Sequence, residues 1–298
     1  MAKEVYWHLP GFYVNFYLYQ ILMDLMKDYP DKFRENYKIG SVYGTFPGAI
    51  WNGGRSVLGS TLKSNMEAII DTYNKLDVPV RFTWTNSLLE EKHVYDTYCN
   101  LIMEIANNGK NQVLCNSNVL EEYLRKEYPD FKFVSSTTKR MKDLEALKDE
   151  LSKDYFMVVL DYDLNHDEKV LKELEPVAER VEILVDEICY PNCPKRVEHY
   201  KAESLYQLRF DKGKPFECPN IKSQPTFEDC KKRPAFISAE ELSTYADRGY
   251  VNFKLVGRGL PQNVLIESIL YYFTKDEASK RFVEEKIKRT LTAIKNSR

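Results

Sequence analysis

The sequence alternates short apolar stretches with segments of helical periodicity along its whole length. Eight stretches have the composition of strands, at residues 5–9, 37–43, 80–85, 112–115, 132–135, 157–160, 181–185 and 251–255. Seven or eight helical patterns separate and follow them, for example at 16–26 and 62–76. Strands separated by helices pair in parallel, and eight such units are the number that closes a (β/α)8 barrel. We therefore predict a TIM-like α/β barrel formed by a single domain over residues 1–298, with a doubly wound sheet as the alternative.

The overall charge and length narrow the class of protein further. The chain has 298 residues and a formal net charge of −2, which gives no general attraction to nucleic acid but leaves room for a local basic patch. The first residues lack the pattern of a signal peptide, and no apolar run approaches the length that spans a membrane. We expect a cytoplasmic protein with no membrane partner.

A cysteine-rich insertion follows the seventh predicted strand, at residues 186–235. It holds four of the six cysteines, with spacings C-x3-C and C-x11-C: Cys189, Cys193, Cys218 and Cys230. Nearby prolines fix φ and remove N–H donors, so we expect a stiff, irregular segment. Four sulfurs on such a segment suit an iron–sulfur cluster or zinc, whereas two disulfides or four unrelated thiols are the alternatives. A reducing cytoplasm disfavours the disulfides.

Other residues that could take part in catalysis or binding also follow predicted strands. In a barrel the carboxyl ends of the strands share one rim, where the active sites of this fold lie. The residues and segments expected at that rim are His8, the loop 44–56, Asn86, Cys115, the run 135–139, Asp161, Cys189 and Arg258. Asp161 and Asp163 are candidates for acid–base chemistry, although helix capping is the more common role of such a pair. His199 could replace one thiolate in a zinc site, but a solvated histidine beside Glu198 is the simpler interpretation.

Two basic positions indicate an anion site. The loop 44–56 contains Gly53 and Gly54 and then Arg55, and glycines allow backbone amides to approach an anion closely. Arg258 follows the eighth predicted strand, where barrels often bind anions. The loop lacks the lysine pattern of a nucleotide P-loop. The alternatives are a structural loop around its aromatic residues and a structural salt bridge for Arg258.

Several blocks of the sequence resemble the collagenase-like U32 peptidase family, which includes oxygen-independent hydroxylases of tRNA, ribosomal RNA and the ubiquinone ring. The specific block is residues 249–258, GYVNFKLVGR, which looks like the family pattern G-x-x-x-F-K-I-E-G-R. Residues 38–44, 113–136 and 181–193 resemble further family segments, so the likeness covers most of the chain. Val256 stands where the family has glutamate, Thr138 where it has glutamine, and the first cysteine pair is more closely spaced. The chain thus resembles a divergent member.

The resemblance implies a barrel with a [4Fe–4S] cluster, whose ligands would be Cys189, Cys193, Cys218 and Cys230. It implies an enzyme that hydroxylates or otherwise modifies a ring, a nucleotide or a small anionic metabolite, with a partner chain as a further expectation. The alternative is a zinc-stapled barrel that binds or assembles without catalysis. A peptidase is the least supported reading, because residues 135–139 lack a G-x-S-x-G elbow and no histidine is placed as a base. We therefore expect Ser136 and Thr137 to be hydrogen-bonding residues of the rim.

Overall fold

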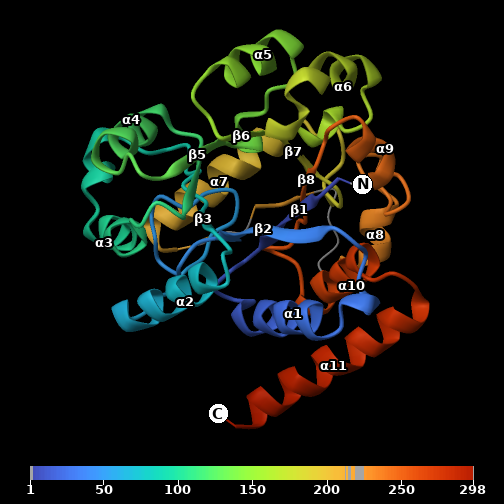
Figure 1. Cartoon of the computed structure of the whole chain (residues 1–298). Helices are drawn as coiled ribbons and strands as arrows, with labels where there is room; N and C mark the ends of the chain where they lie inside the picture. The colour runs from blue at the N-terminus through green and yellow to red at the C-terminus, as the bar shows by residue number, and fades with distance from the viewer. Residues whose placement is uncertain (1–2, 212, 214–215, 219–224, 298) are drawn as a thin grey trace.

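A closed barrel of eight parallel strands forms the centre of the molecule (Figure 1). The computed structural model describes residues 3–211, 213, 216–218 and 225–297. The strands are β1 Val5–Pro10, β2 Tyr37–Gly44, β3 Val80–Phe82, β4 Gln112–Cys115, β5 Lys132–Ser135, β6 Met157–Val159, β7 Val181–Leu184 and β8 Asn252–Lys254. Each strand pairs with its sequence neighbour, and β8 closes the ring by pairing with β1. The predicted barrel is confirmed in place of a doubly wound sheet, with all eight strands at the expected positions.

Helices surround the barrel and follow the strands in turn (Figure 1). The α-helices are α1 Phe16–Asp28, α2 Lys63–Lys75, α3 Thr97–Ala106, α4 Asn118–Glu127, α5 Leu144–Ser152, α6 Glu168–Leu174, α7 Arg196–Arg209, α8 Phe227–Lys231, α9 Leu242–Asp247, α10 Gln262–Phe273 and α11 Glu277–Asn296. Short 3-10 helices include η3 Thr137–Lys139, η4 Tyr162–Leu164 and η5 Glu175–Arg180. The helix expected over 168–180 changes to 3-10 geometry at Glu175, where Pro176 removes a helical donor.

The cysteine-rich insertion is more helical than the sequence suggested. It contains the 14-residue helix α7 and the short helix α8, so the expectation of an irregular segment was wrong over these residues. The reason is local, because the prolines of the insertion lie at 191, 194, 215, 219, 225 and 234 and none falls within α7.

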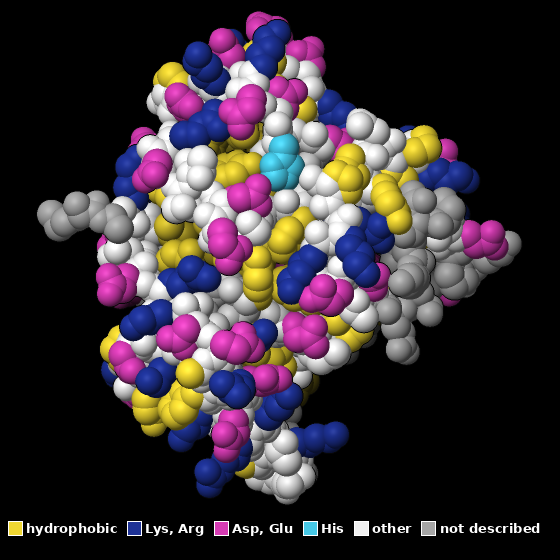
Figure 2. Space-filling model, turned by 90° about the vertical axis from the view of Figure 1, so that its right-hand side faces the viewer, with side chains coloured by type: hydrophobic (Ala, Val, Ile, Leu, Met, Phe, Trp, Pro, Cys, Tyr) yellow, Lys and Arg dark blue, Asp and Glu magenta, His cyan; other side chains and the backbone are white. Residues whose placement is uncertain are grey.

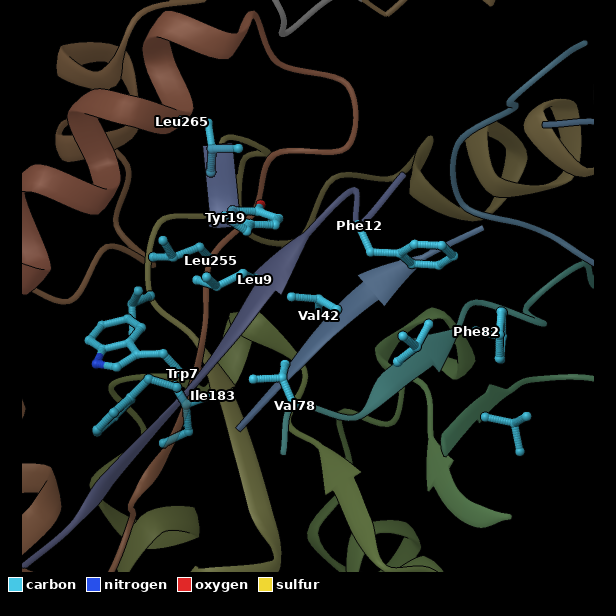
Figure 3. Packing of buried hydrophobic residues seen from close by; sticks show 14 of the residues in the cluster. Trp7, Leu9, Phe12, Tyr19, Val42, Val78, Phe82, Ile183, Leu255 and Leu265 are labelled. Carbon is cyan, nitrogen blue, oxygen red and sulfur yellow. The ribbon is translucent and has the colours of Figure 1, made fainter. Parts of the chain in front are cut away.

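Most of the hydrophobic core lies between the barrel and its helices. Trp7 of β1 illustrates it, since its ring packs on Phe253 of β8 and on Tyr272 and Phe273 of α10 (Figure 3 shows the neighbourhood of Trp7). A smaller apolar cluster joins alternate residues of β4 to β7: Leu114, Val134, Met157, Val159 and Leu184. Alternation along a strand sends successive side chains to opposite faces, so every strand contributes to both sides of the barrel wall.

A group of charged side chains also lies inside the protein, and we call it the inner charge layer: His8, Arg81, Glu182 and Lys254. Glu182 accepts hydrogen bonds from Arg81 Nη1 and, at 2.9 Å, from Lys254 Nζ. His8 Nε2 lies 3.4 Å from the same carboxylate. Burial lowers the pKa of His8 to about 3, so the imidazole is neutral at pH 7. The layer therefore holds two cations and one shared carboxylate.

Charged side chains of both signs lie on the outer surface. On the face shown in Figure 2, basic and acidic side chains are interspersed, as expected from the formal net charge of −2. None of the helices within the described residues has the length and apolar composition needed to cross a membrane.

Candidate functional site

A pocket of about 340 Å³ lies at the carboxyl end of the barrel strands. Its wall includes Tyr43 near the end of β2 and Lys254 at the end of β8, and helix α7 adds further residues. We call this cavity the mouth pocket. Six of the residues predicted for the site line it: Gly54, Arg55, Ser136, Thr137, Cys218 and Arg258. The structure thus brings these six residues together around one pocket.

Arg258 is held by neutral oxygen atoms. Its Nη1 donates to Asn52 Oδ1 at 3.0 Å and to Thr83 Oγ1 at 2.9 Å, and its Nη2 donates to Gly53 O at 3.1 Å. Within the described part of the chain, no carboxylate forms an ion pair with this guanidinium. Burial, together with the positive charge of the nearby Arg55, lowers the pKa of Arg258 to about 10. The structural salt bridge considered for Arg258 is thus not what holds it.

The glycine-rich loop brings a second cation to the same place. A side chain at Gly53 would meet Thr85 O at 2.2 Å, so only glycine allows the loop to approach the end of β3 this closely. Gly54 has φ +73°, and a Cβ there would lie 3.0 Å from Arg258 Nη2. Arg55 Nη1 donates to Gly54 O at 2.8 Å, which turns the side chain back over the loop. The loop therefore places two arginines side by side.

Residues 135–139 supply hydroxyl groups. Ser136 caps η3, because its Oγ accepts from the backbone N of Thr138 at 3.1 Å and shares a 2.9 Å hydrogen bond with Thr138 Oγ1. Thr137 Oγ1 is buried without a hydrogen-bond partner. Both residues line the mouth pocket, as expected for hydrogen-bonding groups of the rim.

The acidic pair after β6 has structural partners. Asp161 caps η4 by accepting from the backbone N of Asp163 at 3.0 Å, and its Oδ2 lies 3.1 Å from Arg140 Nε. Asp163 Oδ2 accepts from Arg140 Nη2 at 2.6 Å and pairs with Lys142. Burial raises the pKa of Asp161 to about 6. Neither residue lines the pocket, so capping describes them better than acid–base chemistry.

Three other rim candidates also lie outside the pocket. His8 belongs to the inner charge layer, and Cys115 is fully buried in the hydrophobic core. Asn86 donates to Ile50 O at 2.8 Å and to Ser204 O at 3.1 Å, which ties the glycine-rich loop to α7. His8 lies within β1, Cys115 is the last residue of β4, and only Asn86 follows its strand, so the prediction that all three follow a strand was wrong for the first two.

The four cysteines of the insertion occupy different surroundings. Cys189 is buried in a small cluster with Tyr162 and Ala235, and Cys193 packs against that cluster. Cys230 is buried in the main core, and Cys218 lines the mouth pocket. Across the described residues, no three His, Cys, Asp or Glu side chains come together to hold a metal ion. As placed, the cysteines do not fit a four-thiolate site, and the cluster stays a prediction.

His199 faces the mouth pocket and is not a solvated side chain beside Glu198. Its ring stacks on Phe216 with centroids 4.6 Å apart, and its Nε2 lies 3.6 Å from Glu203 Oε1. Both rings line the pocket, to which they add a flat aromatic surface.

Sequence reasoning missed several residues of the pocket. Lys254 Nζ lies 4.1 Å from the centre of the Tyr43 ring, and Arg258 Cζ lies 6.0 Å from it. Arg196 and Tyr200 enter from α7. Lys254 stands inside the 249–258 block and could have been found there, whereas nothing local distinguishes Arg196 from the other basic residues of the insertion.

Comparisons with known proteins bear on the fold of this site. No protein-family model matches the chain, and no curated protein sequence matches it. A solved structure described as the U32 peptidase Mk0906 matches with a TM-score of 0.55 and 15% sequence identity. The match covers 88% of this chain and 96% of that one. The chain has the fold of this U32 protein. The predicted resemblance is confirmed at the level of fold, and the low identity fits a divergent member.

Proposed function

We propose that this chain is a divergent U32-like enzyme whose mouth pocket binds a small anionic substrate. The observation that carries the proposal is Arg258, a partly buried cation held by three neutral oxygens. A buried charge is costly unless an opposite charge accompanies it, and a carboxylate or phosphate of the substrate would supply that charge. Arg55 lies beside it and adds a second positive charge.

The rest of the pocket suits a substrate with a flat ring. The stacked rings of His199 and Phe216 provide a planar wall, and Leu114 and Leu184 provide an apolar one. Hydroxyl groups of Ser136 and Thr137 can orient polar substituents. Together with the family resemblance, this lining supports a nucleotide or a small ring metabolite as the molecule that is hydroxylated or otherwise modified.

The proposal that the protein binds an iron–sulfur cofactor rests only on the family resemblance and on the presence of four cysteine thiols in the insertion. An iron–sulfur cluster bound by the four cysteines would supply electron transfer, but the described placement does not assemble them, and no step is assigned to it. The test is to quantify iron and acid-labile sulfide in protein purified under anaerobic conditions. Stoichiometric iron that Cys193→Ala abolishes and Cys99→Ala preserves would support a cluster. Colourless protein with stoichiometric zinc would favour the non-catalytic, zinc-stapled alternative.

A peptidase remains the weaker reading, although the similar solved structure is described as one. The Ser136 hydroxyl is hydrogen-bonded to Thr138, and among the described residues it has no histidine partner to act as base. Ser136→Ala should leave any cleavage by the preparation unchanged. Cleavage by highly purified protein that disappears in this variant would overturn the reading.

The binding of anions tests the proposal directly. Charge-assisted capture of an oxyanion contributes about 1.5–3 kcal/mol, or on the order of tenfold to a hundredfold in affinity. In equilibrium dialysis, the affinity of Arg258→Ala for phosphate and acetate should fall by this factor. The affinity of Arg258→Lys should fall by less, because lysine keeps the charge but lacks the planar guanidinium that makes two parallel hydrogen bonds. Arg248→Gln is the matched control, because Arg248 pairs with Glu168 and Glu175 away from the pocket. Unchanged affinity in folded Arg258→Ala would make Arg258 a structural residue and refute the proposal.

A further inference from the structure

A second arginine near the mouth pocket has hydrogen-bond donors without partners. Arg196 is the first residue of α7 and is only 4% exposed. Its Nη2 donates to Glu187 Oε2 at 3.2 Å, but its Nε and Nη1 are buried and have no hydrogen-bond partner. Buried donors in folded proteins nearly always have partners, so two orphaned donors on one guanidinium indicate that a partner is missing.

Another buried donor without a hydrogen-bond partner lies close to Arg196. Its guanidinium lies between two aromatic rings, 5.5 Å from the centre of Tyr162 and 4.5 Å from that of Tyr200. Nη1 of Arg140, whose guanidinium lies 4.7 Å from the same Tyr162 ring, is also buried without a hydrogen-bond partner. Two guanidinium groups beside one tyrosine ring thus have donors without acceptors, and Asp161 Oδ2, which pairs with Arg140 at 3.1 Å, is an acceptor without a hydrogen bond in the same region.

This region adjoins the mouth pocket. Arg196, Tyr200 and Thr137 line the pocket, and the partnerless Thr137 Oγ1 belongs to its wall. The amino terminus of α7, a helix of 14 residues, is also there, and helix amino termini favour negative charge. The partnerless donors of Arg196 and Thr137 thus belong to two residues that border the same pocket.

The neighbouring carboxylates are already committed. Glu187 accepts from Arg196 on one oxygen and from the backbone N of Cys189 at 2.9 Å on the other. Asp161 and Asp163 pair with Arg140. No carboxylate of the described residues accepts from Nε or Nη1 of Arg196. These donors thus lack an acceptor among the described residues, and a bound anion would supply one.

We propose that Arg196, with Thr137, forms a second oxyanion subsite of the mouth pocket, distinct from the one at Arg258. Its ligand is a carboxylate or phosphate group that accepts from Arg196 Nε and Nη1 along the planar edge of the guanidinium. This inference shares the pocket with the proposed function but depends on a different arginine.

The stoichiometry of phosphate binding tests the subsite. Equilibrium dialysis of the full chain with inorganic phosphate should give two equivalents per chain. Arg196→Lys keeps a cation for Glu187 but loses the planar edge, so it should retain one equivalent and weaken the other at least tenfold. Arg258→Ala should remove the other equivalent, and the double variant should remove both. Competition by acetate would identify a carboxylate-tolerant subsite.

The two proposals fail in different ways. One equivalent in the wild type that Arg258→Ala removes and Arg196→Lys preserves would overturn the second subsite and leave the proposed function standing. If the wild type binds one equivalent of phosphate and only Arg196→Lys weakens it, the second subsite stands and the proposed function at Arg258 is overturned. Binding of no phosphate by the folded wild type would overturn both. Arg248→Gln serves as the control for loss of an arginine elsewhere, and equal melting temperatures would show that Arg196→Lys is folded.

Discussion

The inner charge layer and the mouth pocket contain the same kinds of side chains but give them different partners. Inside the protein, Arg81 and Lys254 share the carboxylate of Glu182, which is fully buried. At the mouth, Arg258 contacts three neutral oxygens. The two regions are close, since Lys254 belongs to the layer and also lines the pocket.

The difference separates structural charge from functional charge. A buried cation that has its carboxylate is satisfied by the fold, and removing that carboxylate leaves it uncompensated. A cation that the fold leaves with neutral partners is ready for a ligand, and such perturbed groups gather at functional sites. The following predictions test this distinction, from the largest expected effect to the smallest.

Glu182→Gln should be the most damaging change. It leaves Arg81 and Lys254 without their shared negative charge in the interior, which typically costs about 3–5 kcal/mol. Urea unfolding measures the loss, and Glu168→Gln is the control, because Glu168 is exposed and its pair with Arg248 contributes roughly 0–1 kcal/mol. Equal effects of the two changes would show that the inner layer is not a structural unit.

Lys254 should make stability depend on pH in the alkaline range. Burial lowers its pKa to about 8 from the usual 10.5, against the opposing effect of Glu182. Between these two values the unfolded chain binds the proton that the folded chain has lost, so this residue makes stability rise with pH. From pH 8 to pH 9.5 the wild type should gain about 1–2 kcal/mol relative to Lys254→Met in urea unfolding. A constant difference between the two proteins would contradict the lowered pKa.

Arg258→Gln should change stability little, in contrast to Glu182→Gln. Three hydrogen bonds are lost, but an uncompensated cation is removed with them, so we expect a net cost below about 1.5 kcal/mol. Added phosphate should stabilise the wild type and have less effect on the variant, because a ligand stabilises only the state that binds it. A cost as large as that of Glu182→Gln would place Arg258 with the structural charges.

The cysteines provide the smallest expected effects in metal-free protein. Cys230→Ala removes a sulfur from the packed core and should cost about 1 kcal/mol, whereas Cys193→Ala, at a partly exposed position, should cost less. Urea unfolding in the presence of a chelator gives both values. A far larger loss for both variants in protein purified without chelator would reveal a bound metal, since metal binding adds to the stability of the folded state.

Local pattern was enough to predict the barrel and part of the mouth pocket. Short apolar strands with helices between them predict parallel pairing and a common carboxyl rim, whatever the details of packing. Arg258 and the Gly53–Gly54–Arg55 loop could therefore be placed at the rim from their position after a strand. The end of β3 at Phe82 could not, since beyond it the chain meets the remote glycine-rich loop, where Gly53 N donates to Thr83 O at 3.3 Å.

Only the tertiary structure decided which charged side chains pair inside the protein and which line the pocket. Glu182 meets Arg81 across 101 positions of sequence and Lys254 across 72, and no local signal announces either contact. Arg196 became a pocket residue because the insertion folds into α7 and returns to the barrel mouth. The sequence by itself determined which residues lie on strands and at which end. Barrel closure determined which charges are paired, because pairing depends on distances between segments that are remote in the chain.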